Sequence, residues 1–230
     1  MSEGIGHFMK KLIRSLPAGI EFAVVVGIAF GYAIIISLLR WQGLTPQRPL
    51  SSYNLVILAV FELTLGAILV SFLWARDWRP RTIGLLPTFK DTGVGLLLLA
   101  ATTIVWIVTF YLTFFISPET VMQMRAVVAQ LKSVAPNAAI LVGASLINAA
   151  FEEVFVSGYV ISALKPVRGP LIAIGVSVTI RLLYHLYQGR MAFLGIAPLG
   201  LIYAIWYART GRLWPLLVAH AVQDIAALLL

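Results

Sequence analysis

Long apolar runs, separated by short polar or Pro- and Gly-marked breaks, fill most of the sequence. A helix needs about 20 apolar residues to cross a hydrocarbon core of roughly 30 Å, and the runs have about that length. The pattern predicts an all-α polytopic membrane helix bundle with about seven transmembrane helices, in a range of about six to eight. The predicted spans are Phe22–Leu39, Tyr53–Ala75, Gly93–Phe115, Ala138–Ala163, Pro170–Tyr187, Ala192–Ala208 and Leu213–Leu230.

Two amphipathic segments are predicted to lie in the membrane interface as short helices. In the first, within residues 1–20, an apolar face lies opposite Lys10, Lys11 and Arg14. The second starts at Ser117-Pro118-Glu119, a sequence typical of a helix N-terminus, and continues with an apolar stripe. It is interpreted either as an access gate to a site inside the membrane or as a packed interfacial linker. The apolar side chains are Phe8, Met9, Leu12, Ile13 and Leu16 in the first segment and Val121, Met124, Val128 and Leu131 in the second.

The composition supports a membrane protein and narrows its chemistry. The chain is 60% hydrophobic and 11% charged, whereas soluble domains have about 45–50% apolar and 25% charged residues. A soluble domain and a disordered chain are therefore excluded. Because there is no cysteine, a disulfide scaffold, thiol catalysis, Cys-ligated zinc and iron–sulfur clusters are excluded as well. Any chemistry must come from His, Asp, Glu, Ser or Arg.

The basic residues differ in number between the two sides of the predicted bundle. Of 17 Lys and Arg residues, 11 lie at the N-terminus and in the loops at 76–90, 165–168 and 209–212, and 5 lie in the opposite loops. The positive-inside rule then predicts a multi-pass protein of the cell membrane with a cytoplasmic N-terminus. The net charge of +8 indicates topology and contact with anionic lipid, so no nucleic-acid partner is expected.

Ionisable residues inside the predicted spans are unevenly distributed. Glu62 is the one well inside the first three spans, whereas the last four contain Glu152, Glu153, Arg181, His185, His220 and Asp224. Each such group costs about 3 kcal/mol on insertion scales. We therefore expect the six to converge on a polar interior, although each alone could simply join helices through hydrogen bonds.

The spacing of these residues sharpens the expectation. Three pairs are four residues apart and so share a helix face: Asn148 and Glu152, Arg181 and His185, and His220 and Asp224. Glu152 and Glu153 are adjacent and diverge by about 100° around a helix, which indicates different roles. Carboxylates and imidazoles in a desolvated pocket are suited to activating water.

In straight, untilted helices these side chains would lie at different depths in the membrane. At about 1.5 Å per residue from the cytoplasmic ends, Glu152 lies roughly 17 Å deep, His220 and Asp224 roughly 10–17 Å and His185 roughly 22 Å. Convergence therefore requires helix tilt, a later start of the fifth span, or unwinding near Gly189.

Three motifs occur in order within the fourth, fifth and seventh spans. They are Glu152-Glu153-Val154-Phe155-Val156-Ser157-Gly158, Arg181-Leu182-Leu183-Tyr184-His185 and His220-Ala221-Val222-Gln223-Asp224. Together they resemble the signature of the CPBP (Abi) family, the intramembrane CAAX-protease and bacteriocin-processing proteases, over about Ala138 to Leu230. In that signature arginine usually stands at the position of Ser157 and phenylalanine at that of Arg181.

The resemblance implies an intramembrane endopeptidase that acts on a membrane-associated or lipidated protein or peptide. One membrane domain would comprise the interfacial segment 1–20, the spans and surface helix of 21–137, and a catalytic core at 138–230. Glu152 and His185 would activate water, Glu153 would support them, and His220 and Asp224 would stabilise the oxyanion. Zinc or another divalent metal, with Glu152, His185 and His220 as candidate ligands, and a metal-free glutamate mechanism both stay open.

The chain departs from the signature at two positions. It has Ser157 where the signature has an arginine, and it has Arg181 where the signature has a phenylalanine. We hypothesise that Arg181 supplies the positive charge that the family usually carries at the position of Ser157, and that it pairs with Glu153 or Asp224. Asn148 and Ser157 are the other supporting residues. A catalytically silent scaffold or immunity protein is one alternative, and a proton-coupled transporter is a weaker one because no inverted repeat is apparent. The sequence indicates neither the substrate nor the oligomeric state.

Overall fold

The computed structural model of the protein describes residues 14–229, and within this range the chain is helical and contains no strand. Six helical segments of the described chain are long and apolar enough to cross a membrane. They are α2 (Ala18–Trp41), α3 (Ser52–Ala75), α4 (Phe89–Ile116), α6 with η1 and α7 (Ala138–Arg168), α8 with η2 (Pro170–Gln188), and η3 with α9 (Ala192–Thr210). The protein is therefore a multi-pass, all-α membrane protein, as the apolar pattern predicts.

Six of the predicted spans match these segments to within a few residues. The seventh, Leu213–Leu230, is a helix, α10 (Trp214–Leu229), but it has 16 residues. At 1.5 Å per residue this is about 24 Å, less than a hydrocarbon core of roughly 30 Å. The interfacial helix predicted within residues 1–20 falls mostly on residues 1–13, which lie outside the described residues.

Polar side chains fix where several of the helices begin. Ser51 accepts a hydrogen bond from the backbone of Asn54 at the start of α3, and Thr88 accepts one from Asp91 at the start of α4. Asn137 caps α6 in the same way. Each cap satisfies a backbone N–H that has no partner inside the helix, so the membrane helices start at the polar breaks of the sequence.

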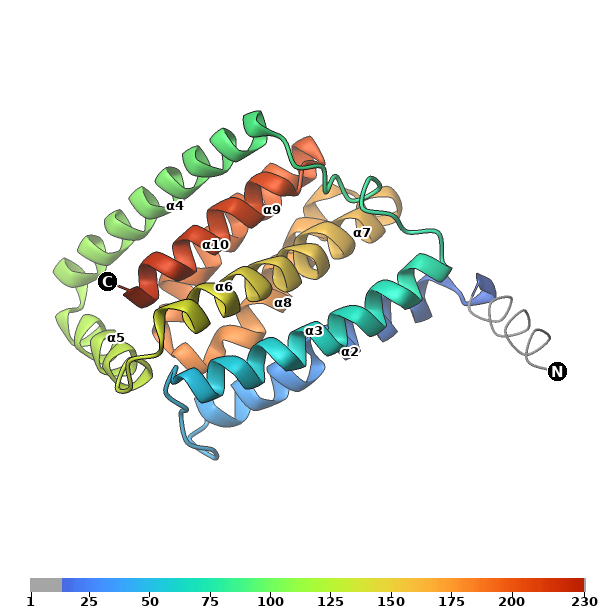
Figure 1. Ribbon diagram of the computed structural model, residues 1–230. Helices are drawn as coiled ribbons and strands as arrows, with labels where there is room; N and C mark the ends of the chain where they lie inside the picture. Colours follow the sequence, from blue (N-terminus) through green and yellow to red (C-terminus); the bar gives the residue numbers. More distant parts are fainter. Residues whose placement is uncertain (1–13, 230) are drawn as a thin grey trace.

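The helices form a bundle with α4 along one edge and the pair α2 and α3 along the opposite edge (Figure 1). Helices α6 and α10 lie between these edges: α10 packs on α4 and α6, and α6 packs on α3. Helix α8 packs against α2, α7 and α9 and touches the π-helical turn η1 (Glu153–Tyr159) that follows α6. This arrangement brings α6, η1, α8 and α10 to the middle of the bundle.

The loops counted as basic in the sequence meet at one end of the bundle. Arg212 forms an ion pair with Asp91 at 2.5 Å, and Lys165 donates to the carbonyl oxygen of Ala208 at 2.7 Å. Three loops that are distant in the sequence thus lie together, as they must if the helices cross the membrane in alternating directions.

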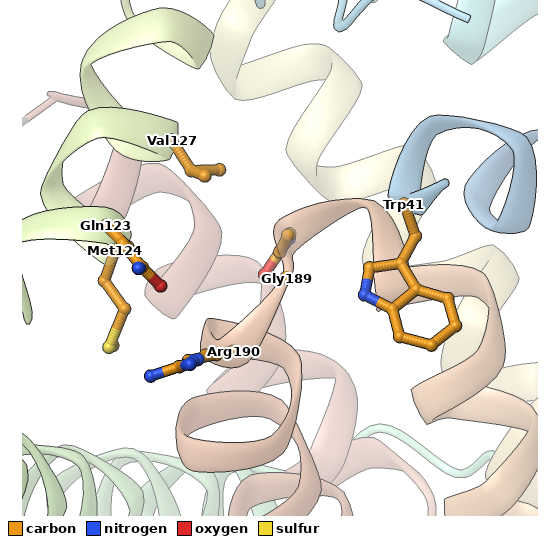
Figure 2. Close-up of a pocket in the computed structure, with 7 residues that line it drawn as sticks. Trp41, Gln123, Met124, Val127, Gly189 and Arg190 are labelled. Atoms are coloured by element: carbon orange, nitrogen blue, oxygen red, sulfur yellow. The ribbon is translucent and has the colours of Figure 1, made fainter. Parts of the chain in front are cut away.

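The surface helix α5 (Pro118–Leu131) packs along its apolar stripe, where Val121, Met124 and Leu131 are buried. Next to it lies a cavity of about 250 Å³. Figure 2 shows residues of α5 on one side of this cavity, the turn at Gly189 and Arg190 in the middle and Trp41 of α2 on the other side. The packing agrees with an interfacial linker, and a role of α5 as an access gate stays a prediction.

Candidate active site

The two adjacent glutamates stand where the helix geometry changes. Glu152 is the last residue of α6 (Ala138–Glu152), and Glu153 is the first of η1, which continues into α7 (Val160–Arg168). A π-helical turn is wider than an α-helical one and is frequent at functional sites. Both side chains are buried, with exposed fractions of 7% for Glu152 and 0% for Glu153. Ser157 donates to Oε2 of Glu153 at 2.6 Å from within the same turn.

Arg181 of α8 (Pro170–His185) holds both glutamates. Its Nη2 lies 2.6 Å from Oε1 of Glu153, and its Nη1 lies 3.4 Å from Oε2 of Glu152. The same Nη2 is 3.5 Å from the hydroxyl of Ser157. Of the two partners hypothesised for Arg181, the structure pairs it with Glu153. The guanidinium thus lies beside the residue at which the family signature usually has arginine.

Glu152 has two further partners, and each contacts a different oxygen. Tyr184 donates its hydroxyl to Oε2 at 2.6 Å, and Asn148 donates its amide to Oε1 at 3.2 Å. The sequence reasoning missed Tyr184, although it follows Arg181 by three residues and so lies on nearly the same face of α8. Oε2 is therefore held by Tyr184 and Arg181, whereas Oε1 has a single contact, with Asn148.

His220 of α10 connects the remaining carboxylates. Its Nδ1 lies 2.8 Å from Oε1 of Glu153, and its Nε2 lies 3.5 Å from Oδ2 of Asp224. Because Glu153 also binds Arg181, one continuous set of polar contacts joins α6, η1, α8 and α10. It contains four of the five residues predicted as catalytic and all three predicted as supporting.

His185, the fifth predicted catalytic residue, lies next to this set at the end of α8. Its Nδ1 is 2.9 Å from the carbonyl oxygen of Arg181, and its ring lies 4.6 Å from the ring of Tyr184. Helix α8 ends at His185, a 3-10 turn follows, and Gly189 has a φ of 62°. The chain therefore unwinds close to Gly189, which was one of the three adjustments that convergence required.

Helix α9 (Ala197–Thr210) shapes the space around the guanidinium. A Cβ on Gly200 would lie 2.8 Å from Cδ of Arg181, so glycine is what permits the close approach of α9. The ring centroid of Tyr203 lies 5.9 Å from the guanidinium carbon. The position of Arg181 therefore depends on α9 as well as on the two glutamates.

Glu62 of α3 belongs to the same neighbourhood, which the sequence did not reveal. Its Oε1 accepts a hydrogen bond from Nδ2 of Asn148 at 2.8 Å, and the same nitrogen contacts Glu152. Glu62 is 6% exposed. It is the residue of the first three predicted spans that the sequence singled out as an unexpected charge.

The donor atoms do not fit a metal ion in this arrangement. Within residues 14–229, no three His, Asp or Glu side chains are grouped so that they could hold one. Oε2 of Glu152 is bound by Tyr184 and Nδ1 of His220 by Glu153, and the positive charge of Arg181 lies between the two glutamates.

Comparisons with known proteins place the C-terminal part of the chain in a family. Residues 134–226 match the family described as Type II CAAX prenyl endopeptidase Rce1-like. No curated protein and no solved structure matches the chain. The matched range covers α6, η1, α7, α8, α9 and most of α10, which carry all three motifs. Residues 134–226 are therefore an Rce1-like type II CAAX prenyl endopeptidase domain of the CPBP (Abi) family.

Proposed function

We propose that the protein is an intramembrane endopeptidase that cleaves a peptide bond in a prenylated protein or peptide, using water activated by Glu152 and His185. The observation that carries the proposal is the continuous set of polar contacts that joins Glu152, Glu153, Arg181 and His220 inside the bundle. Buried charged groups are costly in a membrane, and such groups are usually functional. The prenylated substrate is taken from the family that residues 134–226 match.

Glu152 is the proposed base that takes a proton from the attacking water. Its Oε2 is bound by Tyr184 and Arg181, so Oε1, with a single contact to Asn148, is the oxygen suited to accept the proton. Nδ1 of His185 lies against a carbonyl oxygen, which can only accept. The hydrogen of a neutral His185 ring is thereby placed on Nδ1, which leaves Nε2 to orient the water.

The remaining steps are the attack of the water on the substrate, the stabilisation of the oxyanion and the departure of the leaving nitrogen. The water oxygen bonds to the carbonyl carbon of the substrate, and a tetrahedral oxyanion forms. Nδ1 of His220 donates to Glu153, and Nε2 of the protonated ring, whose contact with Asp224 is as long as 3.5 Å, donates a hydrogen bond to the oxyanion. The carbon–nitrogen bond then breaks, and the proton held by Glu152 passes to the leaving nitrogen. Arg181 keeps the two buried glutamates in place throughout.

The test is hydrolysis of a farnesylated peptide with a CAAX-type C-terminus by the full chain in liposomes. Glu152→Ala should lower the rate by at least about 100-fold, since a positioned general base contributes about 10²–10⁴. Glu119→Gln on the exposed face of α5 is the matched control and should leave the rate unchanged. The same peptide without its prenyl group tests whether the lipid is part of the substrate.

Two results would overturn the proposal. If Glu152→Ala cleaves as fast as the wild type, Glu152 is not the base. If the wild type cleaves no prenylated peptide and releases the same membrane peptides as Glu152→Ala in a comparison of protein termini, the chain acts as a scaffold instead.

A further inference from the structure

Glu62 is a buried carboxyl group with no part in the reaction described above. It lies on α3, outside the range that matches the family, and it is 6% exposed. Its Oε2 is buried without a hydrogen-bond partner in the described part of the chain. Its Oε1 accepts from Asn148 at 2.8 Å. The side chain of Glu62 is therefore hydrogen-bonded to the protein through Asn148.

Asn148 stands between two glutamates. Its Nδ2 carries two hydrogens, of which one is directed at Oε1 of Glu62 and the other at Oε1 of Glu152, 3.2 Å away. The shorter of the two contacts is the one to Glu62. The amide plane of Asn148 is thus set mainly by Glu62, and this plane decides where the second hydrogen points.

The hydrogen bonds from Glu62 through Asn148 end at Oε1 of Glu152, which is the atom that accepts the proton in the proposed reaction. Oε1 of Glu152 has its single contact to Asn148, whereas Oε2 is bound by Tyr184 and Arg181. A change in the direction of the amide therefore acts on the oxygen that accepts the proton of water. Inside a low-dielectric bundle such a linked set of hydrogen bonds acts as a unit.

On the basis of the proposed function, we propose that Glu62 is a positioning residue that fixes Oε1 of Glu152 through the amide of Asn148. The active site then extends beyond the matched domain to α3. Glu62 does not touch the substrate, so its loss should lower kcat and leave KM nearly unchanged.

The experiment uses the full chain in liposomes with the prenylated peptide and a set of substitutions along the chain of contacts. Glu62→Leu should lower kcat by about 10-fold or more, as expected for a lost hydrogen bond in a charged network. Glu62→Gln keeps an oxygen that accepts from Asn148, so its kcat should stay within about threefold of the wild type. Thr64→Val, on the exposed face of the same helix, is the matched control and should not change kcat.

A double-mutant cycle separates positioning from mere helix packing. If Glu62 acts through Asn148, the double variant Glu62→Leu with Asn148→Leu should lose no more kcat than Asn148→Leu alone. If Glu62 only joins α3 to α6, Glu62→Leu should lower the unfolding temperature and leave kcat unchanged, and this result would overturn the proposal. Additive losses of kcat would overturn it as well.

Glu152→Ala run beside these variants distinguishes the two possible failures. Wild-type-like kcat in Glu62→Leu together with loss of cleavage in Glu152→Ala removes the role of Glu62 and leaves the proposed function intact. If neither the wild type nor any variant cleaves the peptide, the proposed function and, with it, the positioning role of Glu62 are both overturned.

Discussion

Replacing Arg181 by leucine removes a guanidinium that lies 2.6 Å from Glu153 and 3.4 Å from Glu152. Glu153 is 0% exposed, so its charge would be left buried without this partner. Breaking a buried ion pair from one side costs about 3–5 kcal/mol. For a chain of this size, a loss of about 1 kcal/mol lowers the unfolding temperature by about 2–4 °C, so we expect a decrease of roughly 6–20 °C.

Arg181→Leu should also abolish cleavage, because both glutamates lose a contact that sets their position. Thermal unfolding in detergent and hydrolysis of the prenylated peptide measure the two effects separately. Arg209→Leu, at an exposed position near the end of α9, is the control and should change neither. Arg181→Lys keeps the charge without the planar fork and should fall between the wild type and Arg181→Leu.

Ser157→Arg in the Arg181→Leu background tests whether a guanidinium at position 157 of η1 can replace the one that Arg181 supplies from α8. The hydroxyl of Ser157 already lies 2.6 Å from Oε2 of Glu153, so an arginine there starts beside the same carboxylate. Partial recovery of cleavage is expected. Full activity of Arg181→Leu alone, with an unchanged unfolding temperature, would refute the reasoning.

Three further predictions follow from the packing and the topology. Gly200→Ala places a methyl group 2.8 Å from Cδ of Arg181 and should reduce the rate of cleavage. Gly143→Ala is the control, because a Cβ there has nothing within 4 Å, and it should leave the rate unchanged. Equal rates in the two variants would contradict the packing argument. Treatment with a chelator should leave cleavage unchanged because no three His, Asp or Glu side chains of the described residues are grouped to hold a metal ion, and a loss that zinc restores would contradict this. Because the chain has no cysteine, Thr210→Cys and Gln130→Cys each give a single thiol. A membrane-impermeant maleimide should label Thr210→Cys from the cytoplasmic face and Gln130→Cys from the opposite face. The reverse labelling pattern would contradict the predicted topology.

Much of the site follows from spacing within single helices. The pairs Asn148 and Glu152, and His220 and Asp224, are in contact as the four-residue spacing predicts. Such pairs can be read from a sequence because they depend on helix geometry alone. The boundaries of the spans follow in the same way, since a polar break must lie near each membrane surface.

Contacts between helices could not be predicted from the sequence. Arg181 had two possible partners, and the choice of Glu153 over Asp224 depends on the rotation of α8 against η1. The π-helical turn at Glu153–Tyr159 has no signal in the apolar pattern, yet it sets the direction of both glutamates. Glu62 was visible as a buried acid, but its link to Glu152 required the packing of α3 on α6.

The contribution of α10 has a consequence for the order of biosynthesis. His220 and Asp224 come from the last described helix, whereas Glu152 and Glu153 enter the membrane much earlier in translation. Until α10 inserts, the glutamates lack His220, so a ribosome-bound or truncated chain carries an incomplete centre. The set of polar contacts around the two glutamates is therefore complete when α10, the last described helix, packs against α4 and α6.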